Sequence, residues 1–442
     1  MKNSVKFNEN YPDISRSNEL YERALGLMHP VSQTLAKGPT QFINGVAPKY
    51  LKKAKGARVW DVDGNEYLDY NMGIGPISLG YAYDKVDNAV INQLKDGITF
   101  SLMHELELLA SEKIAEVIPN AESIRISKTG GDVCSAAVRI ARAFTGREKV
   151  LCCGYHGWHD WYIITTSRAK GIPNANRQLV DKIAYNDIED VKAKLTPDVA
   201  CLILEPFVFD APENNFLHEV AELCKANGTL LIFDEMWTGF RVAVGGAQEY
   251  FGIKPDLAVY SKAVANGMPV AFLTGRADAM QLFEEEVFFF TTFGGEALSL
   301  AATIATIEEM QEKNVIQHIA SIGNDLKTGY NQIAEELGMS HITQCKGFDC
   351  RTIMTFTEEG GNPLIQKSFV QQEMIKRGIL WSGFHNVCFS HTNEDVAYTL
   401  EAYRDVLPLL KTAIEAGNLE HQLRGEPVQA VFRKVDFRKA EG

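Results

Sequence analysis

The stretch TLLIFDE, residues 229–235, carries the pattern on which the fold prediction rests. Its apolar residues follow one another without alternation and end at an acidic side chain, Asp234. An unbroken apolar run of this length is typical of a strand that is buried on both faces of a parallel sheet. We therefore expect a buried strand here, with Asp234 at its carboxyl end.

Three further apolar runs end in a chemically useful residue. KVLCCG leads into Tyr155 and His156, ACLIL ends at Glu205, and DLAVYS ends at Lys262. Helical patterns separate these runs, which predicts an α/β domain with a parallel sheet covered on both faces. Ligands bind outside the carboxyl ends of such strands, so these residues are predicted to share one site. The alternative for each carboxylate is a helix cap.

A second signal is KTGGDVCSAAVRIARAFTGR, residues 128–147. Gly130 and Gly131 precede a helix with an apolar stripe, and Gly146 ends it. Two glycines let backbone amides approach an anion, and the helix dipole favours a phosphate at that end. The alternative is a plain turn in which Asp132 is the N-cap.

These features together suggest one cofactor. A lysine in a protected pocket can lose its proton and attack a carbonyl carbon. Pyridoxal 5'-phosphate needs such a lysine, a phosphate cradle and an acidic partner for its pyridine nitrogen. Lys262, the two glycines and Asp234 match these needs.

The chain resembles the class III aminotransferases, which are pyridoxal-phosphate enzymes of fold type I, and within them the glutamate-1-semialdehyde aminomutase branch. The matching motifs include GGDVCSAAVRIARAFTGREKV, GYHGWHD, IFDEMWTGFR, YSKAVANGMP and TTFGGEALSLAA. The resemblance implies a large domain with a mostly parallel seven-stranded sheet covered by helices, and a smaller α+β domain built from both chain ends. We expect the large cofactor-binding domain at 66–310 and the two parts of the small domain at 1–65 and 311–442.

The resemblance also implies roles around the cofactor ring. Lys262 would form the Schiff base with the cofactor and later move a proton at the substrate carbon. Asp234 would pair with the pyridine nitrogen, and Met236 would pack behind the ring. Tyr155 would stack on the other face, with His156 supporting the turn that carries it.

Other implied roles concern the phosphate and the partner subunit. Gly130 and Gly131 would bind the phosphate through backbone amides. Thr292 would reach the phosphate of the neighbouring subunit, because the family is built as a homodimer with shared sites. Glu205 would lie beside the substrate face of the cofactor. The surrounding VFFFTTF segment, residues 287–293, is expected to be core or dimer interface.

The chain departs from the family pattern at three places near the cofactor. Gly131 stands where the family has Ser or Thr, so one hydroxyl donor of the phosphate loop is missing. Trp237 stands where many relatives have Gln, and Glu296 and Ala297 replace Asn and Pro. We expect the cradle to survive, because backbone amides do most of the binding, and Trp237 to shape the pocket.

Two further departures concern the substrate. Gln41 in GPTQFINGV replaces the aminomutase Arg that holds the substrate carboxylate, and His385 in SGFHNVCFSH replaces a Glu. A neutral amide cannot replace a bidentate Arg–carboxylate clamp without a large loss. With Trp237 and Trp381, these residues favour a neutral, hydroxyl-rich or ring-shaped acceptor, such as a keto-sugar or cyclic ketone. The alternative is that another Arg takes over the carboxylate.

We therefore expect a ping-pong transamination from an amino-acid donor, with glutamate as the first candidate, to a carbonyl acceptor. The first rival is an intramolecular aminomutase of the glutamate-1-semialdehyde type. The second is a non-catalytic protein that keeps the fold for binding.

Composition sets the remaining expectations. The 442 residues carry a net charge of −13, which argues against binding nucleic acid or an anionic membrane. No stretch is apolar over the roughly 18 residues that a membrane-spanning helix needs, and we see no signal peptide. The eight cysteines show no CxxC pair, which fits a reducing cytoplasm. We expect no metal site, although His156 and His159 have a spacing that a metal pair can use.

Local patterns predict three elements outside the sheet. A helix is expected near 15–37, a hairpin around the Asp-Gly turn of 58–70, and a long helix over 298–336.

Overall fold

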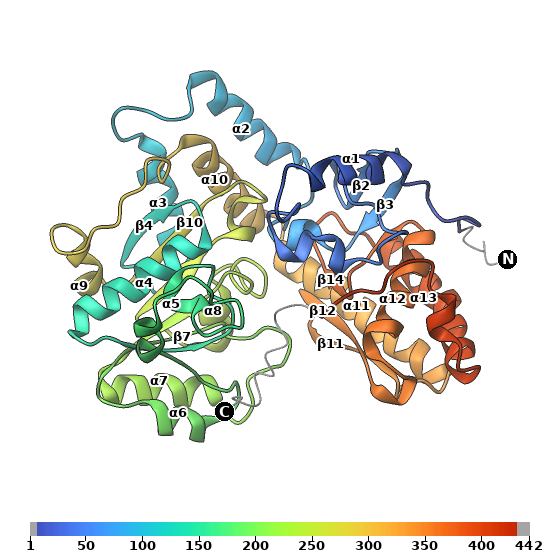
Figure 1. The fold of residues 1–442 in the computed structure, drawn as a ribbon. Coiled ribbons are helices and arrows are strands. Elements are labelled where there is room, and N and C mark those ends of the chain that lie inside the picture. The colour runs from blue at the N-terminus through green and yellow to red at the C-terminus, as the bar shows by residue number, and fades with distance from the viewer. Residues whose placement is uncertain (1–6, 431–442) are drawn as a thin grey trace. The chain divides into compact units, whose positions relative to one another are not determined.

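The computed structural model describes residues 7–430, which form two compact units (Figure 1). The large unit spans residues from Asp84 to Ile316. The terminal unit combines the residues up to Tyr83 with those from Gln317 onward, drawn in blue and in orange to red. The boundaries differ from the expected 65/66 and 310/311. The first lies later because strand β3 (Glu66–Asp69) pairs with strands of the terminal unit.

A seven-stranded sheet lies at the centre of the large unit, in the order β4-β10-β9-β8-β7-β5-β6. The five strands from β9 to β6 run parallel, while β10 is antiparallel to both of its neighbours. Every residue of β7 and β8 is buried, as the unbroken apolar runs predict. The mostly parallel sheet is therefore confirmed. Its strands are β4 (Ser123–Ser127), β5 (Lys149–Cys153), β6 (Val180–Lys182), β7 (Val199–Leu204), β8 (Leu230–Asp234), β9 (Leu257–Tyr260) and β10 (Ala271–Gly275).

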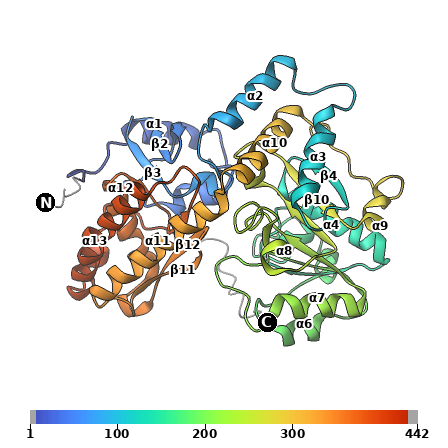
Figure 2. The same cartoon turned by 180° about the vertical axis from the view of Figure 1, so that it is seen from behind.

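Helices cover this sheet, and α4 packs along β7 to β10 through a buried apolar stripe. Helix α10 packs against α2 and α3, as the view from behind shows (Figure 2). The helices of the unit are α2 (Asp84–Asp96), α3 (Glu105–Val117), α4 (Gly130–Thr145), α5 (Asp160–Ile163), α6 (Ile188–Lys194), α7 (Phe216–Asn227), α8 (Gly246–Phe251), α9 (Ala277–Met280) and α10 (Ala297–Glu312), with 3-10 turns η4 (Asn174–Leu179), η5 (Lys262–Ala265) and η6 (Gln281–Phe283).

Two predicted helices are shorter in the structure. The expected helix over 298–336 divides into α10 and α11 (Val315–Glu336), with Asn314 between them at a φ of 50°. Asn tolerates this left-handed conformation, which a helix cannot continue through. Near the N-terminus, α1 covers only Ser15–Leu25 and ends at Gly26.

The terminal unit contains two small sheets and four helices among its described residues. The predicted hairpin is confirmed, since β2 and β3 pair antiparallel around a turn in which Gly64 has a φ of 98°. Strand β13 pairs with β3 and so joins the two chain ends in one sheet. The strands are β1 (Leu51–Lys55), β2 (Arg58–Asp61), β3, β11 (Thr343–Phe348), β12 (Arg351–Phe356), β13 (Ile379–Leu380) and β14 (Phe384–Asn386), and the helices are α1, α11, α12 (Pro363–Lys376) and α13 (Asn393–Glu415).

Within the described residues, no helix combines the length and apolar character needed to cross a membrane.

Candidate functional site

Four adjacent parallel strands of the large unit present the predicted side chains at one edge of the sheet. Asp234 is the last residue of β8, Glu205 follows β7, and Tyr155 and His156 come shortly after β5. Lys262 follows β9 and begins the turn η5. Because β9, β8, β7 and β5 are neighbours, their carboxyl ends meet at the same edge.

Asp234 is a buried carboxylate that accepts three hydrogen bonds. Its exposed fraction is 1%. Oδ2 lies 2.7 Å from Nδ1 of His156 and 3.6 Å from the Sγ atom of Cys134, and Oδ1 accepts the N–H of Met236 at 3.1 Å. A buried charge needs such donors to offset its lost hydration. We call Asp234, His156 and Cys134 the Asp234 network.

Cys134 is the member of this network that the sequence analysis missed. It is the fifth residue of α4. Burial, and then the negative charge of Asp234, raise the pKa of its thiol well above the usual value. Cys134 therefore remains a protonated donor at neutral pH. Among the described residues, the three side chains also form a group whose ligand atoms could hold a metal, but their hydrogen bonds already explain why they lie together.

Lys262 has a backbone conformation that is rare for a residue with a side chain. Its φ is 53°, in the left-handed region, where a non-glycine residue costs about 1–2 kcal/mol. Such strain is concentrated at functional sites. The Nζ atom lies 3.9 Å from the ring centroid of Trp237, whose indole is 5% exposed. Ser261, just before the lysine, donates its hydroxyl to the carbonyl of Val270 at 2.6 Å.

Glu205 holds the turn that carries Tyr155. Its Oε2 accepts the backbone N–H of Tyr155 at 2.9 Å, and the side chain is 3% exposed. A Cβ atom added to Gly154 would lie 2.7 Å from that oxygen, so the turn needs glycine there. The structure therefore gives Glu205 a positioning contact with the turn. Its predicted place beside the substrate face stays a prediction.

The glycine cradle opens helix α4, and its cap differs from the alternative considered above. The N-cap is Thr129, whose Oγ1 accepts the N–H of Asp132 at 3.2 Å. The Asp132 carboxylate in turn accepts the N–H of Thr129 at 3.0 Å, which completes a capping box. Asp132 is thus the third helical residue and not the N-cap.

Close packing explains Gly130. A Cβ atom there would lie 2.8 Å from the Sδ atom of Met236, so the side chain behind the predicted ring position leaves no room for one. The first N–H groups of a helix have no partner within the helix and are suited to an anion. The cradle, the buried acid and the strained lysine together fit a phosphorylated pyridine aldehyde.

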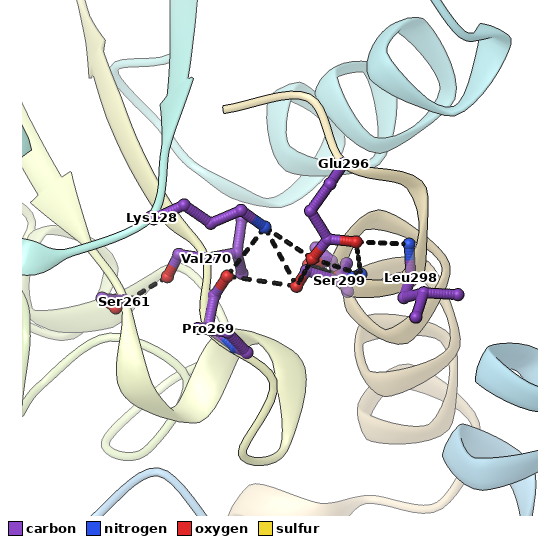
Figure 3. A network of polar contacts seen from close by, with 8 residues as sticks. Lys128, Ser261, Pro269, Val270, Glu296, Leu298 and Ser299 are labelled. Atoms are coloured by element: carbon purple, nitrogen blue, oxygen red, sulfur yellow. Dashed lines mark hydrogen bonds and ion pairs between the residues drawn. The ribbon is translucent and has the colours of Figure 1, made fainter. Parts of the chain in front are cut away.

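An ion pair fastens the loops around this cradle (Figure 3). The Nζ atom of Lys128, just before Thr129, lies 2.6 Å from Oε1 of Glu296 and donates to the carbonyl of Pro269 at 3.0 Å. Glu296 also caps α10 by accepting the N–H of Leu298 at 2.8 Å. Burial lowers the pKa of Lys128, against the opposing effect of Glu296. The sequence analysis singled out Glu296 as a departure but not its partner.

Thr292 lies on an exposed segment between η6 and α10. Phe288, Phe290 and Phe293 nearby are 73%, 58% and 59% exposed. These three rings are not core in the single chain, so of the two expected roles for 287–293 the dimer interface is the one that stays a prediction for them. Val287 is buried, as expected.

The predicted substrate residues Gln41 and His385 belong to the terminal unit. Gln41 is 7% exposed and donates to the Thr40 hydroxyl at 3.3 Å. His385 is fully buried, with Nδ1 at 2.9 Å from the Thr352 hydroxyl and Nε2 at 2.8 Å from the Tyr403 hydroxyl. Burial, and then His391, lower the pKa of His385 to about 3.

Both ring nitrogens of His385 are thus already bonded, which favours a structural role. We call His385, Thr352 and Tyr403 the His385 network. Trp381 is also fully buried in this unit.

Comparison with known proteins identifies the family. The family profile described as Aminotransferase class-III matches residues 44–389. The chain is 35% identical to a 3-aminobutyryl-CoA aminotransferase of Cloacimonas acidaminovorans over 90% of this chain and 98% of that protein. It is 34% identical to a glutamate-1-semialdehyde 2,1-aminomutase of Archaeoglobus fulgidus over 89% of this chain and 100% of that protein.

A solved structure agrees with these relatives. The FumI protein of Sphingopyxis sp., solved in a PLP internal aldimine form, superimposes with a TM-score of 0.85 at 26% identity, covering 91% of this chain and 98% of that one. The strained lysine, the buried acid and the glycine cradle occur in a chain that is similar to these proteins over nearly its whole length. It belongs to the class III aminotransferase family and is a pyridoxal-phosphate-dependent aminotransferase.

Proposed function

We propose that the enzyme moves an amino group from an amino-acid donor, with glutamate as the first to test, to a carbonyl acceptor that has no α-carboxylate. A keto-sugar or a cyclic ketone meets this description. The observation that carries the proposal is Gln41, a buried neutral amide at the position that the aminomutase resemblance assigns to a carboxylate-binding Arg. Without a guanidinium, the loss of a bidentate contact disfavours an α-keto acid as acceptor.

The residues of the large unit have distinct parts in this reaction. The cofactor, when bound, supplies an electron-withdrawing ring that stabilises negative charge at the substrate carbon. Lys262 removes and returns the proton at that carbon through its Nζ atom. The indole face of Trp237 lies 3.9 Å from this atom and limits the positions that the side chain can take. Asp234 would hold a proton on the pyridine nitrogen of the bound cofactor, and His156 and Cys134 fix the carboxylate of Asp234 for that role.

The name of one relative supports an acceptor of this kind. The Cloacimonas protein is named for 3-aminobutyryl-CoA, whose amino group is on carbon 3 rather than next to a free carboxylate. We take only one feature from this name. The amine that the present enzyme forms from its carbonyl acceptor is, in our proposal, also not an α-amino acid.

A second candidate is an intramolecular aminomutase acting on glutamate 1-semialdehyde. The Archaeoglobus relative, matched over 100% of its length, bears that name. This reaction needs no external amino donor, which separates it from the first candidate.

We also propose a homodimer with shared sites in the cytoplasm. The exposed phenylalanines Phe288, Phe290 and Phe293, beside Thr292, support a partner on that face, since large exposed apolar patches often mark interfaces. All eight cysteines are free and buried, in keeping with a reducing compartment.

A half-reaction screen tests the substrates. The holoenzyme is mixed with single amino acids, and then with single carbonyl compounds, while the cofactor absorbance is followed between its aldehyde and amine forms. We expect glutamate to produce the amine form, and a neutral ketone or keto-sugar to restore the aldehyde form. Conversion of glutamate 1-semialdehyde to 5-aminolevulinate without a donor would favour the aminomutase instead. Lys262→Ala serves as the inactive control.

A further inference from the structure

Gly131 leaves a space at the phosphate loop that another side chain fills. The family has Ser or Thr at this position, so a hydroxyl donor is missing from the loop of this chain. A Cβ atom added to Gly131 would lie 3.0 Å from Cε1 and 3.1 Å from Nδ1 of His159. The imidazole of His159 therefore occupies the volume that a side chain at position 131 would enter.

The Nδ1 atom of His159 is buried and has no hydrogen-bond partner in the part of the chain that the structure describes. Leaving a buried polar nitrogen without a partner costs about 1–3 kcal/mol. Such an atom calls for an explanation, and a ligand that arrives from outside the chain is one. The side chain does not cap helix α5 either, although His159 is the N-cap residue of that helix.

The local structure fixes where this nitrogen lies. The His159 ring stacks on Trp158, with centroids 4.8 Å apart and planes 22° apart. Its carbonyl accepts the N–H groups of Tyr162 and Ile163 at 3.0 Å each. A Cβ atom on Gly157, whose φ is 99°, would lie 2.9 Å from the Cα of Gly131. The turn therefore rests directly on the first residues of α4.

We infer that His159 is a phosphate ligand of the cofactor, with its Nδ1–H group replacing the hydroxyl that Gly131 lacks. The phosphate-accepting end of α4 then has an imidazole donor beside its backbone amides. A hydrogen bond from this group to a doubly charged phosphate belongs to the stronger, charge-assisted class. The inference uses the cofactor of the family and is independent of the acceptor proposed above.

Two related molecules separate a phosphate contact from a general effect on the site. Apoenzyme is titrated with pyridoxal 5'-phosphate and, separately, with pyridoxal, which has no phosphate. We expect His159→Ala to weaken binding of the phosphorylated form by about 10- to 100-fold, and binding of pyridoxal by less than about 2-fold. The control is His218→Ala, an exposed histidine on α7 of the same unit. Equal weakening for both molecules would overturn the inference.

A reciprocal substitution tests the replacement itself. Gly131→Ser alone should weaken cofactor binding, because its Cβ atom would crowd the imidazole at 3.0 Å. In the double variant with His159→Ala, the space is open and the serine hydroxyl takes over, so affinity should return to within about 5-fold of the wild type. A double variant that binds no more tightly than His159→Ala would contradict the replacement.

A second variant covers the case in which His159→Ala does not fold. His159→Asn keeps an N–H donor near the Nδ1 position, and it should retain preference for the phosphorylated cofactor over pyridoxal. The phosphorus NMR signal of the bound cofactor gives an independent readout. We expect it to shift in His159→Ala and to stay unchanged in His218→Ala, and an unchanged signal in both would count against the contact.

Discussion

Two buried histidines, one in each unit, show how a site of chemistry differs from a structural core. In the His385 network, both ring nitrogens of His385 meet hydroxyl groups of the same unit. In the Asp234 network, His156 bonds Asp234 through Nδ1, but its buried Nε2 has no partner among the described residues. Both nitrogens of His385 are thus satisfied within its own unit. In the large unit, the unsatisfied nitrogen belongs to a histidine that bonds a buried acid, and the strained Lys262 follows the neighbouring strand.

This contrast shows that residue type alone does not distinguish a histidine of a functional site from a structural histidine. Both histidines were candidate site residues in the sequence, His156 after a predicted strand and His385 in the SGFHNVCFSH segment. The number of satisfied polar atoms distinguishes them, and the following experiments test whether that distinction is functional.

Removing Lys262 should have the largest effect. In Lys262→Ala we expect turnover to fall by about 10²- to 10⁴-fold, because the group that we propose to move the substrate proton is lost. The matched control is Lys192→Ala, an exposed lysine on α6. Borohydride reduction followed by peptide mapping should tag position 262 in the wild type, and a tag elsewhere would refute the assignment.

Asp234→Ala removes the carboxylate at the centre of the Asp234 network. We expect a loss of about 10²- to 10³-fold in kcat, on the scale of losing one preorganised charge at a reacting centre. Without the Asp234 carboxylate, the ring nitrogen of the bound cofactor should also lose its proton. The absorbance spectrum of the cofactor reports this change. Full activity in this variant would remove the main difference between the two networks.

The Lys128–Glu296 pair tests whether a buried ion pair of the large unit stabilises the loops around the glycine cradle. The two side chains are 18% and 11% exposed. Lys128→Met should lower the free energy of unfolding of the apoenzyme by about 2–3 kcal/mol, since Glu296 would be left without its cation. Lys254→Met removes the cation of a pair that is 54% and 47% exposed, and should cost less than about 1 kcal/mol. Urea midpoints measure both, and equal losses would argue against a special role.

The His385 network predicts an acid-sensitive terminal unit. The pKa of His385 is lowered to about 3 and that of His391 to about 4, in both cases chiefly by burial. Below the usual value near 6.5 the unfolded chain binds a proton that the folded unit excludes, so stability is complete above that pH and falls as pH decreases.

The expected slope is about 1.4 kcal/mol per pH unit for each histidine between pH 6 and 5. His385→Gln should remove one histidine's share of this slope, as urea midpoints at the two pH values will show. A variant with the full wild-type slope would mean that His385 is not held neutral.

Much of this site could be predicted because strand ends are visible in sequence. Unbroken apolar runs predicted β5, β7, β8 and β9, and the residue after each run gave Tyr155, Glu205, Asp234 and Lys262. Boundaries that depend on a single left-handed residue, such as Asn314, were not predictable from helical periodicity. Partners distant in the chain, such as Cys134 with Asp234, need the fold before they can be seen.

The smallest expected effect concerns Cys134, the weakest donor of the Asp234 network. Its Sγ lies 3.6 Å from the carboxylate, so Cys134→Ala removes one weak hydrogen bond and should lower kcat by about 2- to 10-fold. Cys134→Ser keeps a donor and should recover most of that loss, while shifting the absorbance of the bound cofactor. Since the pKa of the thiol is raised well above its usual value, neutral-pH alkylation should also spare Cys134 in the folded protein. If the Ala and Ser variants are indistinguishable in both kcat and spectrum, Cys134 only fills space in the core. His156 and the amide of Met236 would then hold Asp234 without it.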